Sequence, residues 1–253
     1  MKKFQAEYML KDKTIESIKG ILSDQAVKSV GGKTYALPER VNQIPELVSL
    51  ALKEKFKILP LGNESRIDLS KFSENETLFL KMSRLSRIKK IVPQDLYVVV
   101  EPGLNLRELN SHLLTHNLFY PFSIENSSES VGGSVAVGLS GNASGREVHT
   151  KELVLSLDIV SSSGEILKTG AEVFKSVTGY DVTRLLVGSW GTLGIITSVS
   201  LRLFPLNRKK EFEDLKLSNP TLPQKKEGNN PRTNLNRRIK KLLDPNGVLV
   251  ELF

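Results

Sequence analysis

Glycines are concentrated in one stretch of this 253-residue chain, residues 127–204. Eleven of the 18 glycines lie there, at positions 132, 133, 138, 141, 145, 164, 170, 179, 188, 191 and 194. Glycine permits a positive φ or a close approach of the backbone to another group, and it weakens helices and strands where neither is needed. Because short apolar runs separate these glycines, the stretch predicts a backbone shaped around a bulky ligand.

The glycines belong to an ordered series of motifs. Val131-Gly132-Gly133 is followed by Val135-Ala136 and Gly138-Leu139-Ser140-Gly141, and further motifs occupy residues 163–167, 177–181, 184–189 and 191–197. This series resembles the flavin-binding domain of the vanillyl-alcohol oxidase / p-cresol methylhydroxylase type, in particular the FAD-binding subunits of glycolate oxidase and related 2-hydroxy-acid dehydrogenases. The resemblance implies an α+β fold in which two subdomains clasp an extended FAD.

Apolar periodicity predicts the elements around these motifs. Helices are expected over residues 14–22, 42–52 and 105–114, the last with Asn105 as its N-cap, and over 181–187 with Asp181 as its cap. Strands are expected over residues 25–30, 56–59, 77–80, 88–92 and 97–101, then in a hairpin over 154–168, and as two further strands over 193–196 and 198–204.

Three regions follow from this pattern. Residues 1–206 are expected to form the FAD-binding domain, with subdomains at about 1–92 and 93–206. Residues 207–233 are polar, and this composition predicts a linker. They stand where the family that the chain resembles has a full substrate domain, so that domain is expected to be missing. Residues 234–253 resemble the family's C-terminal helix and tail, and the helix is expected to dock through an apolar stripe of Ile239, Leu242 and Leu243.

The resemblance assigns cofactor contacts to two groups of residues, one in the turn after residue 60 and one in the glycine-rich stretch. They are Leu61, Gly62, Asn63, Glu64, Ser65, Ser130, Val131, Gly132, Gly133, Val135, Ala136, Gly138, Gly141, Gly194, Ile195 and Ile196. Glycines at the start of a helix near Ser130 are expected to bring backbone amides to a phosphate or a flavin carbonyl.

The turn at residues 60–66 departs from the family pattern. In the family a glycine-rich turn there cradles the FAD pyrophosphate with consecutive backbone amides. In this chain Gly62 is the glycine that remains, while Glu64 adds a negative charge that Arg66 is placed to offset. An ordinary surface turn fits this segment about as well as a phosphate cradle.

The histidine and cysteine content indicates whether FAD would be attached covalently and whether a metal site is expected. The chain has no cysteine, and residues 60–66 contain no histidine, so FAD is expected to bind non-covalently. Glu108, His112 and His116 share one face of the predicted third helix, which reads as a solvent-facing polar stripe and not as a metal site. No catalytic residue is assigned, because in the resembling family those groups come largely from the substrate domain.

Net charge and hydropathy indicate which partners and which location to expect for the chain. The net charge is +8, and residues 207–253 hold eleven Lys and Arg against six Asp and Glu, so +5 of it lies in the tail. Few aromatic residues accompany these charges, so nucleic-acid binding is not expected. No apolar run is long enough to span a bilayer, and the N-terminus lacks a secretory pattern, which favours a cytoplasmic location.

Three functional hypotheses remain open at this point. The resemblance favours an FAD-binding oxidoreductase subunit of a multi-chain 2-hydroxy-acid dehydrogenase, whose flavin accepts hydride from a glycolate- or lactate-like substrate. A small stand-alone flavin oxidoreductase is the second hypothesis. The third is a degenerate, non-catalytic protein that kept the flavin fold, which Glu64 and the missing substrate domain favour.

Overall fold

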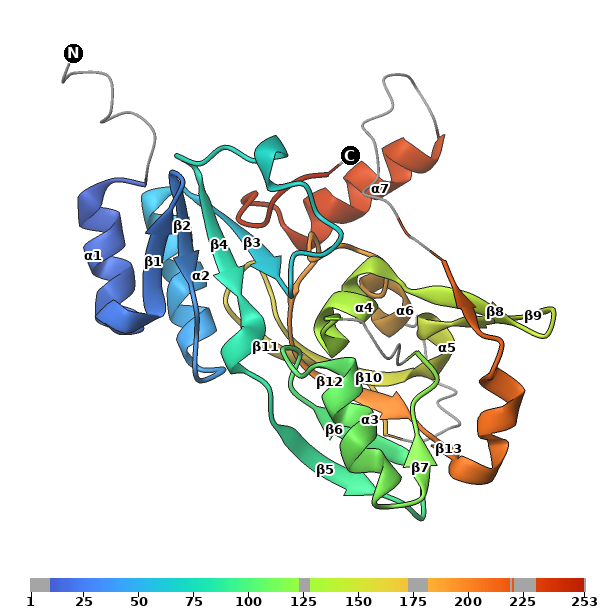
Figure 1. Cartoon of the computed structure of the whole chain (residues 1–253). Helices are drawn as coiled ribbons and strands as arrows, with labels where there is room; N and C mark the ends of the chain where they lie inside the picture. Colours follow the sequence, from blue (N-terminus) through green and yellow to red (C-terminus); the bar gives the residue numbers. More distant parts are fainter. Residues whose placement is uncertain (1–9, 123–127, 173–181, 219, 221–230, 253) are drawn as a thin grey trace.

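The first half of the chain forms a four-stranded sheet covered by two helices. The computed structural model describes residues 10–122, 128–172, 182–218, 220 and 231–252. The sheet order is β1 (Val27–Val30), β2 (Lys33–Ala36), β4 (Thr77–Lys81) and β3 (Lys57–Leu61), with β3 and β2 both parallel to β4. Helices α1 (Asp12–Ile21) and α2 (Gln43–Glu54) pack their apolar faces on it (Figure 1).

A second, antiparallel sheet carries the glycine-rich half of the chain. Its order is β11 (Ile166–Gly170), β10 (Val154–Val160), β12 (Ile195–Arg202), β6 (Tyr97–Val100) and β5 (Ile88–Val92). The change of sheet therefore falls between β4 and β5, earlier than the boundary expected near residue 92. The two strands expected over 193–204 are largely one: β12 runs unbroken from Ile195 to Arg202. Strand β10 pairs with it from Ile195 to Leu201, and β6 pairs with its last four residues.

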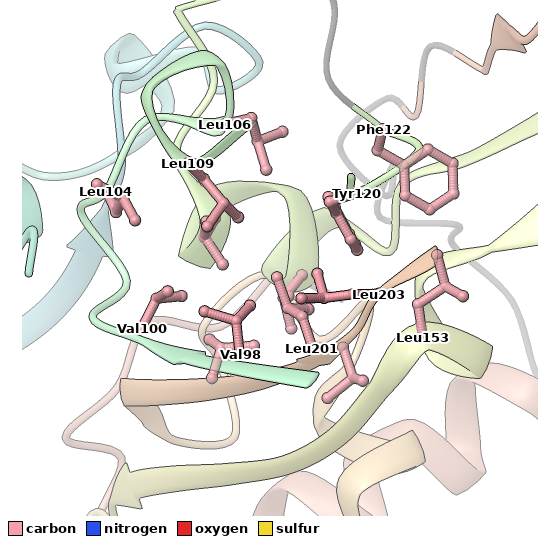
Figure 2. Packing of buried hydrophobic residues seen from close by; sticks show 14 of the residues in the cluster. Val98, Val100, Leu104, Leu106, Leu109, Tyr120, Phe122, Leu153, Leu201 and Leu203 are labelled. Carbon is pink, nitrogen blue, oxygen red and sulfur yellow. The ribbon is translucent and has the colours of Figure 1, made fainter. Parts of the chain in front are cut away.

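The core of this half lies between the second sheet and two helices, α3 (Leu106–Leu114) and α4 (Val131–Val137). Figure 2 shows Leu106 and Leu109 of α3 packed near Val98 and Val100 of β6. The predicted cap of α3 is confirmed, since the Asn105 side chain accepts a hydrogen bond from the Arg107 amide at 2.8 Å.

The expected polar stripe is also present: Glu108, His112 and His116 are exposed. Asp181, the expected cap of α6, lies outside the described residues.

Short elements complete the described fold. The remaining strands are β7 (Leu118–Phe119) with β13 (Phe204–Pro205), and β8 (Ser140–Ala143) between β9 (Arg146–His149) and β14 (Lys216–Leu217). The remaining α-helices are α5 (Thr150–Leu153), α6 (Val182–Leu186) and α7 (Pro231–Leu243). The 3-10 turns are η1 (Asp24–Ala26), η2 (Leu69–Lys71), η3 (Met82–Arg84) and η4 (Leu206–Phe212). No helix in these ranges is long and apolar enough to cross a bilayer.

The first part of the expected linker packs on the domain. The ring of Phe212, at the end of η4, stacks edge-on against Phe119 with 5.6 Å between ring centroids, and lies 5.0 Å from the ring of Phe204. Strand β14 pairs with β8 through Lys216 and Leu217. Residues 207–218 are thus structured because they bury aromatic and aliphatic surface, whereas residues 221–230 lie outside the described part.

The C-terminal segment docks against the domain through part of the expected stripe. Leu242 is 79% exposed, while Ile239 and Leu243 pack against the core and Lys240 is buried. Successive residues in a helix are about 100° apart, so residues 239, 240 and 243 share a face from which residue 242 is turned away. Beyond α7, residues 248–250 lie along β3, with a parallel bridge between Ile58 and Leu249 (Figure 1).

This packing predicts opposite outcomes for two leucines of the C-terminal segment. Leu249→Ala removes a side chain that is 1% exposed and should lower the free energy of unfolding by about 3 kcal/mol. Leu242→Ala, the matched control at an exposed position, should change it by less than about 0.5 kcal/mol. Urea denaturation of both variants provides the measurement. Equal effects at the two positions would contradict the docking.

Candidate cofactor-binding cleft

A two-lobed cleft lies where the two halves of the fold meet. The lobes share six lining residues, so they are continuous: Pro60, Leu61, Gly62, Ser130, Gly133 and Ala136. The first lobe, about 520 Å³ with its open mouth, extends along the turn after β3 to Ile67 and Trp190. The second, about 370 Å³, is more apolar and reaches Met82, Pro102 and Ile196.

The turn after β3 lines the first lobe with Asn63, Glu64 and Ser65. Among the described residues, none accepts a hydrogen bond from the amides of Asn63, Glu64 or Ser65. Consecutive unpaired amides form a concave site for an anion. Glu64 takes φ = 61°, a left-handed conformation that glycine adopts more easily.

Gly62 lets this turn approach α4 closely. A Cβ added at Gly62 would lie 2.5 Å from Ser130 Oγ, the atom that caps α4 by accepting a hydrogen bond from the Gly133 amide at 3.1 Å. Any side chain at position 62 would therefore displace the cap. Asn63 reinforces the contact, because its side-chain amide donates to the carbonyl oxygen of Ser128.

The amides at the start of α4 are already occupied. Val131 N–H donates to Leu104 O at 2.8 Å, and Gly132 N–H donates to Pro102 O at 2.7 Å. With the Gly133 amide held by Ser130, the expectation that these amides are free for a phosphate is not met. The amides without an acceptor among the described residues lie instead in the turn, at Asn63, Glu64 and Ser65.

The two adjacent glycines of α4 have different roles. A Cβ on Gly132 would lie 2.5 Å from Pro102 Cβ, so this glycine allows the helix to pack on the turn after β6. A Cβ on Gly133 would meet only Ser130 Oγ, at 3.0 Å, and the residue borders both lobes. Gly133 is therefore the one whose substitution would fill the cleft.

The charged side chains that line the first lobe, together with Lys81 beside it, form two ion pairs. The Lys81 ammonium lies 2.9 Å from Glu64 Oε1, at an angle that does not make a hydrogen bond, and Arg66 Nε donates to Glu129 Oε1 at 2.8 Å. Burial, and secondly the Glu64 carboxylate, raise the pKa of the nearby Tyr35 phenol. Two carboxylates and two cations leave the lobe with no net charge from these four side chains.

The structure brings most of the predicted contact residues together in the lining. These are Leu61, Gly62, Asn63, Glu64, Ser65, Ser130, Gly132, Gly133, Ala136, Gly194 and Ile196.

Five predicted residues lie outside that lining. Val131, Val135 and Ile195 are buried in the apolar cores. Gly138 ends α4 with φ = 68°, and a Cβ there would lie 3.1 Å from Gly188 Cα, while Gly141 packs in β8 against β14. A glycine-rich motif does not by itself distinguish glycines that face a ligand from glycines that let two backbones pack.

Several lining residues were not predicted. Pro60, Met82, Pro102, Glu129, Ser134, Val137, Trp190 and Gly191 also border the cleft. Trp190 could have been predicted from the sequence, because this tryptophan lies between Gly188 and Gly191, immediately before the 191–197 motif. It is buried with φ = 57°, and its amide donates to Ala136 O at 2.8 Å.

Histidines take no part in the described lining. His112 and His116 are exposed at the end of α3, and His149 pairs with Glu147 at 3.0 Å on β9. A general base of the imidazole type is therefore not provided by the described cleft.

The chain is similar to curated dehydrogenases and to subunits of glycolate oxidase. It is 34% identical over 166 residues to the mitochondrial D-lactate dehydrogenase [cytochrome] of Arabidopsis thaliana, covering 66% of this chain and 29% of the relative. It is 31% identical over 177 residues to the glycolate oxidase subunit GlcE of Escherichia coli, covering 69% and 48%. Over 175 residues it is 28% identical to the glycolate oxidase subunit GlcD of Bacillus subtilis, covering 69% and 37%. The chain thus spans less than half the length of these relatives.

Solved structures share the fold at low sequence identity. Alkyldihydroxyacetonephosphate synthase superposes with a TM-score of 0.66 at 18% identity, covering 79% of this chain and 43% of that one. p-Cresol methylhydroxylase superposes with a TM-score of 0.60 at 17% identity, covering 76% and 43%. These two show that the chain shares their fold. The family model described as "FAD binding domain" matches residues 33–170, more than half of the 253 residues, and the chain therefore belongs to the FAD-binding domain family.

Proposed function

We propose that this chain binds FAD non-covalently in the two-lobed cleft and serves as the flavin-binding part of a 2-hydroxy-acid dehydrogenase. The observation that carries the proposal is the turn at residues 63–65, which lines the first lobe and whose amides have no acceptor among the described residues. The turn lies against α4, where a Cβ on Gly62 would displace the Ser130 cap. The names of the similar D-lactate dehydrogenase and glycolate oxidase subunits support the substrate class.

The residues of the cleft fit FAD. The amides of Asn63, Glu64 and Ser65 would hold the diphosphate in the first lobe. The apolar second lobe, with Met82, Pro102 and Ile196, suits a flat ring system. When bound, FAD supplies the hydride acceptor, and the protein's part is to hold and orient it. The chain has no cysteine and no histidine lines the described cleft, which supports a non-covalent site.

Proton removal from a 2-hydroxy acid calls for a group that the described cleft does not offer. A general base must lie within hydrogen-bond reach of the substrate hydroxyl. The carboxylates of Glu64 and Glu129 are already paired with Lys81 and Arg66. We therefore place the base on a companion chain, in keeping with the subunit names of two relatives.

A branched side chain at residue 133 should abolish flavin binding. Gly133→Val places two methyl groups in the space that both lobes share, so we expect at least a hundredfold loss of FAD affinity, measured by flavin fluorescence quenching. Gly20→Val is the matched control, because it makes the same change in α1, where an added Cβ has open space. Normal FAD binding by Gly133→Val would place the cofactor elsewhere.

Removing the Glu64 carboxylate should strengthen FAD binding. Its charge lies beside the amides that would hold the diphosphate, so Glu64→Gln should lower the FAD dissociation constant about tenfold, or roughly 1.4 kcal/mol. Glu64→Gly should do at least as well, since glycine relaxes the φ of 61°. Isothermal titration of both variants separates the charge effect from the backbone effect. Weaker binding by both would mean that the Glu64–Lys81 pair holds the turn in its binding shape.

The FAD-loaded chain should not oxidise 2-hydroxy acids efficiently without a companion chain. Hydride transfer requires the substrate carbon close to the flavin and a base at its hydroxyl, and the described cleft provides the flavin site alone. Turnover of glycolate and D-lactate with an artificial electron acceptor is measured for the isolated chain and for the chain purified with its companions. Robust turnover by the isolated chain would refute the assignment of the base to a partner.

A further inference from the structure

A buried lysine in α7 is fully occupied by acceptors from three segments. The Lys240 Nζ donates to Asp244 Oδ2 at 2.5 Å, to Thr192 O at 2.8 Å and to Leu249 O at 2.9 Å. Lys240 is 6% exposed and Asp244 is 3% exposed. Burial lowers the pKa of this ammonium group, while the Asp244 carboxylate acts in the opposite direction. A charge at such a site persists only where its partners are held in place.

Asp244 organises the turn that follows α7. Its carboxylate accepts hydrogen bonds from Lys240 and from the amides of Val248 and Leu249, both at 2.9 Å. The residues after this turn then align with β3: Ile58 N–H donates to Val248 O at 2.7 Å, and Val250 N–H donates to Ile58 O at 3.2 Å. The C-terminal segment therefore holds the strand that leads, three residues later, into Leu61 and Gly62 of the cleft.

The same lysine reaches the opposite wall. Thr192 is fully buried and lies between Gly191 and Gly194, which line the second lobe. Its hydroxyl donates to Ser189 O at 2.7 Å, and Lys240 donates to the backbone carbonyl of the same residue. The two walls also meet directly, since a Cβ on Gly191 would lie 3.3 Å from the ring of Pro60.

We propose that residues 240–250 form a clasp that fixes the two walls of the cofactor cleft relative to each other, with Lys240 as the positioning residue of the 191–194 loop. The clasp joins β3 of the first sheet to the loop that precedes β12 of the second. It touches both walls from behind, because neither Lys240 nor Asp244 is among the residues that line the cleft. This inference rests on the proposed role of the cleft as the FAD site.

Neutralising the clasp should weaken FAD binding and loosen one loop. The double variant Lys240→Met/Asp244→Asn removes both buried charges and keeps an oxygen for the Val248 amide. We expect at least a tenfold rise in the FAD dissociation constant, and at least tenfold faster amide exchange in the 191–194 loop without FAD. Lys241→Met is the matched control, because Lys241 is the exposed neighbour and should leave both values unchanged.

A measurement on the unaltered chain keeps the test independent of the variant's folding. Coupling between two sites is reciprocal, so FAD should slow amide exchange at Val248, Leu249 and Val250, although these residues do not line the cleft. Unchanged exchange there on FAD binding overturns the clasp, as does a folded double variant with normal affinity and normal loop exchange. Failure of the unaltered chain to bind FAD would refute the proposed function instead, and the loop exchange of the double variant without FAD would still decide whether Lys240 positions the loop.

Discussion

The cleft depends on close contacts that glycines permit because they carry no side chain. Gly62 brings the turn after β3 onto the Ser130 cap of α4, and Gly132 brings the same helix onto Pro102. Each contact joins α4 to a different part of the fold, one at the end of the first sheet and one after β6. The helix is thereby fixed at the meeting point of the two halves, and the space left beside Gly133 becomes the cleft. Larger side chains at positions 62 or 132 would separate these elements, so the site and the packing are a single constraint.

The ion pairs of the first lobe explain how a turn expected to bind an anion can contain a glutamate. A glutamate in an anion-binding turn suggests that binding has been lost, yet Glu64 lies 2.9 Å from the Lys81 ammonium at the end of β4. The parallel pairing of β3 with β4 matches Leu61 to Lys81, and this register brings the lysine to the turn. The negative charge is therefore partly balanced by a residue 17 positions away in sequence. The sequence of residues 60–66 alone therefore cannot reveal that Lys81 balances the charge of Glu64.

Sequence reasoning recovered what depends on local patterns and missed what depends on tertiary contacts. The cap of α3, the hairpin formed by β10 and β11, and the alternation of elements in the first half follow from capping and apolar spacing, and all are present. Gly138 and Gly141 were grouped with the cofactor residues, but they allow backbone packing against Gly188 and β14. Pro102 and Trp190 reach the lining through long-range packing, which no periodicity encodes.

The C-terminal segment illustrates why an apolar pattern alone does not fully orient a helix. Ile239, Leu242 and Leu243 suggested a hydrophobic stripe, yet the face that docks includes Lys240, and Leu242 is exposed. A buried ammonium is costly unless every donor has an acceptor, so its orientation is more restrictive than that of a leucine, which any apolar surface accepts. Here the acceptors are a carboxylate one turn along the helix and two backbone carbonyls that are fixed by β3 and by the 191–194 loop. The polar contact therefore sets the rotation of α7 about its axis, and the apolar residues on the same face add packing to an orientation already determined.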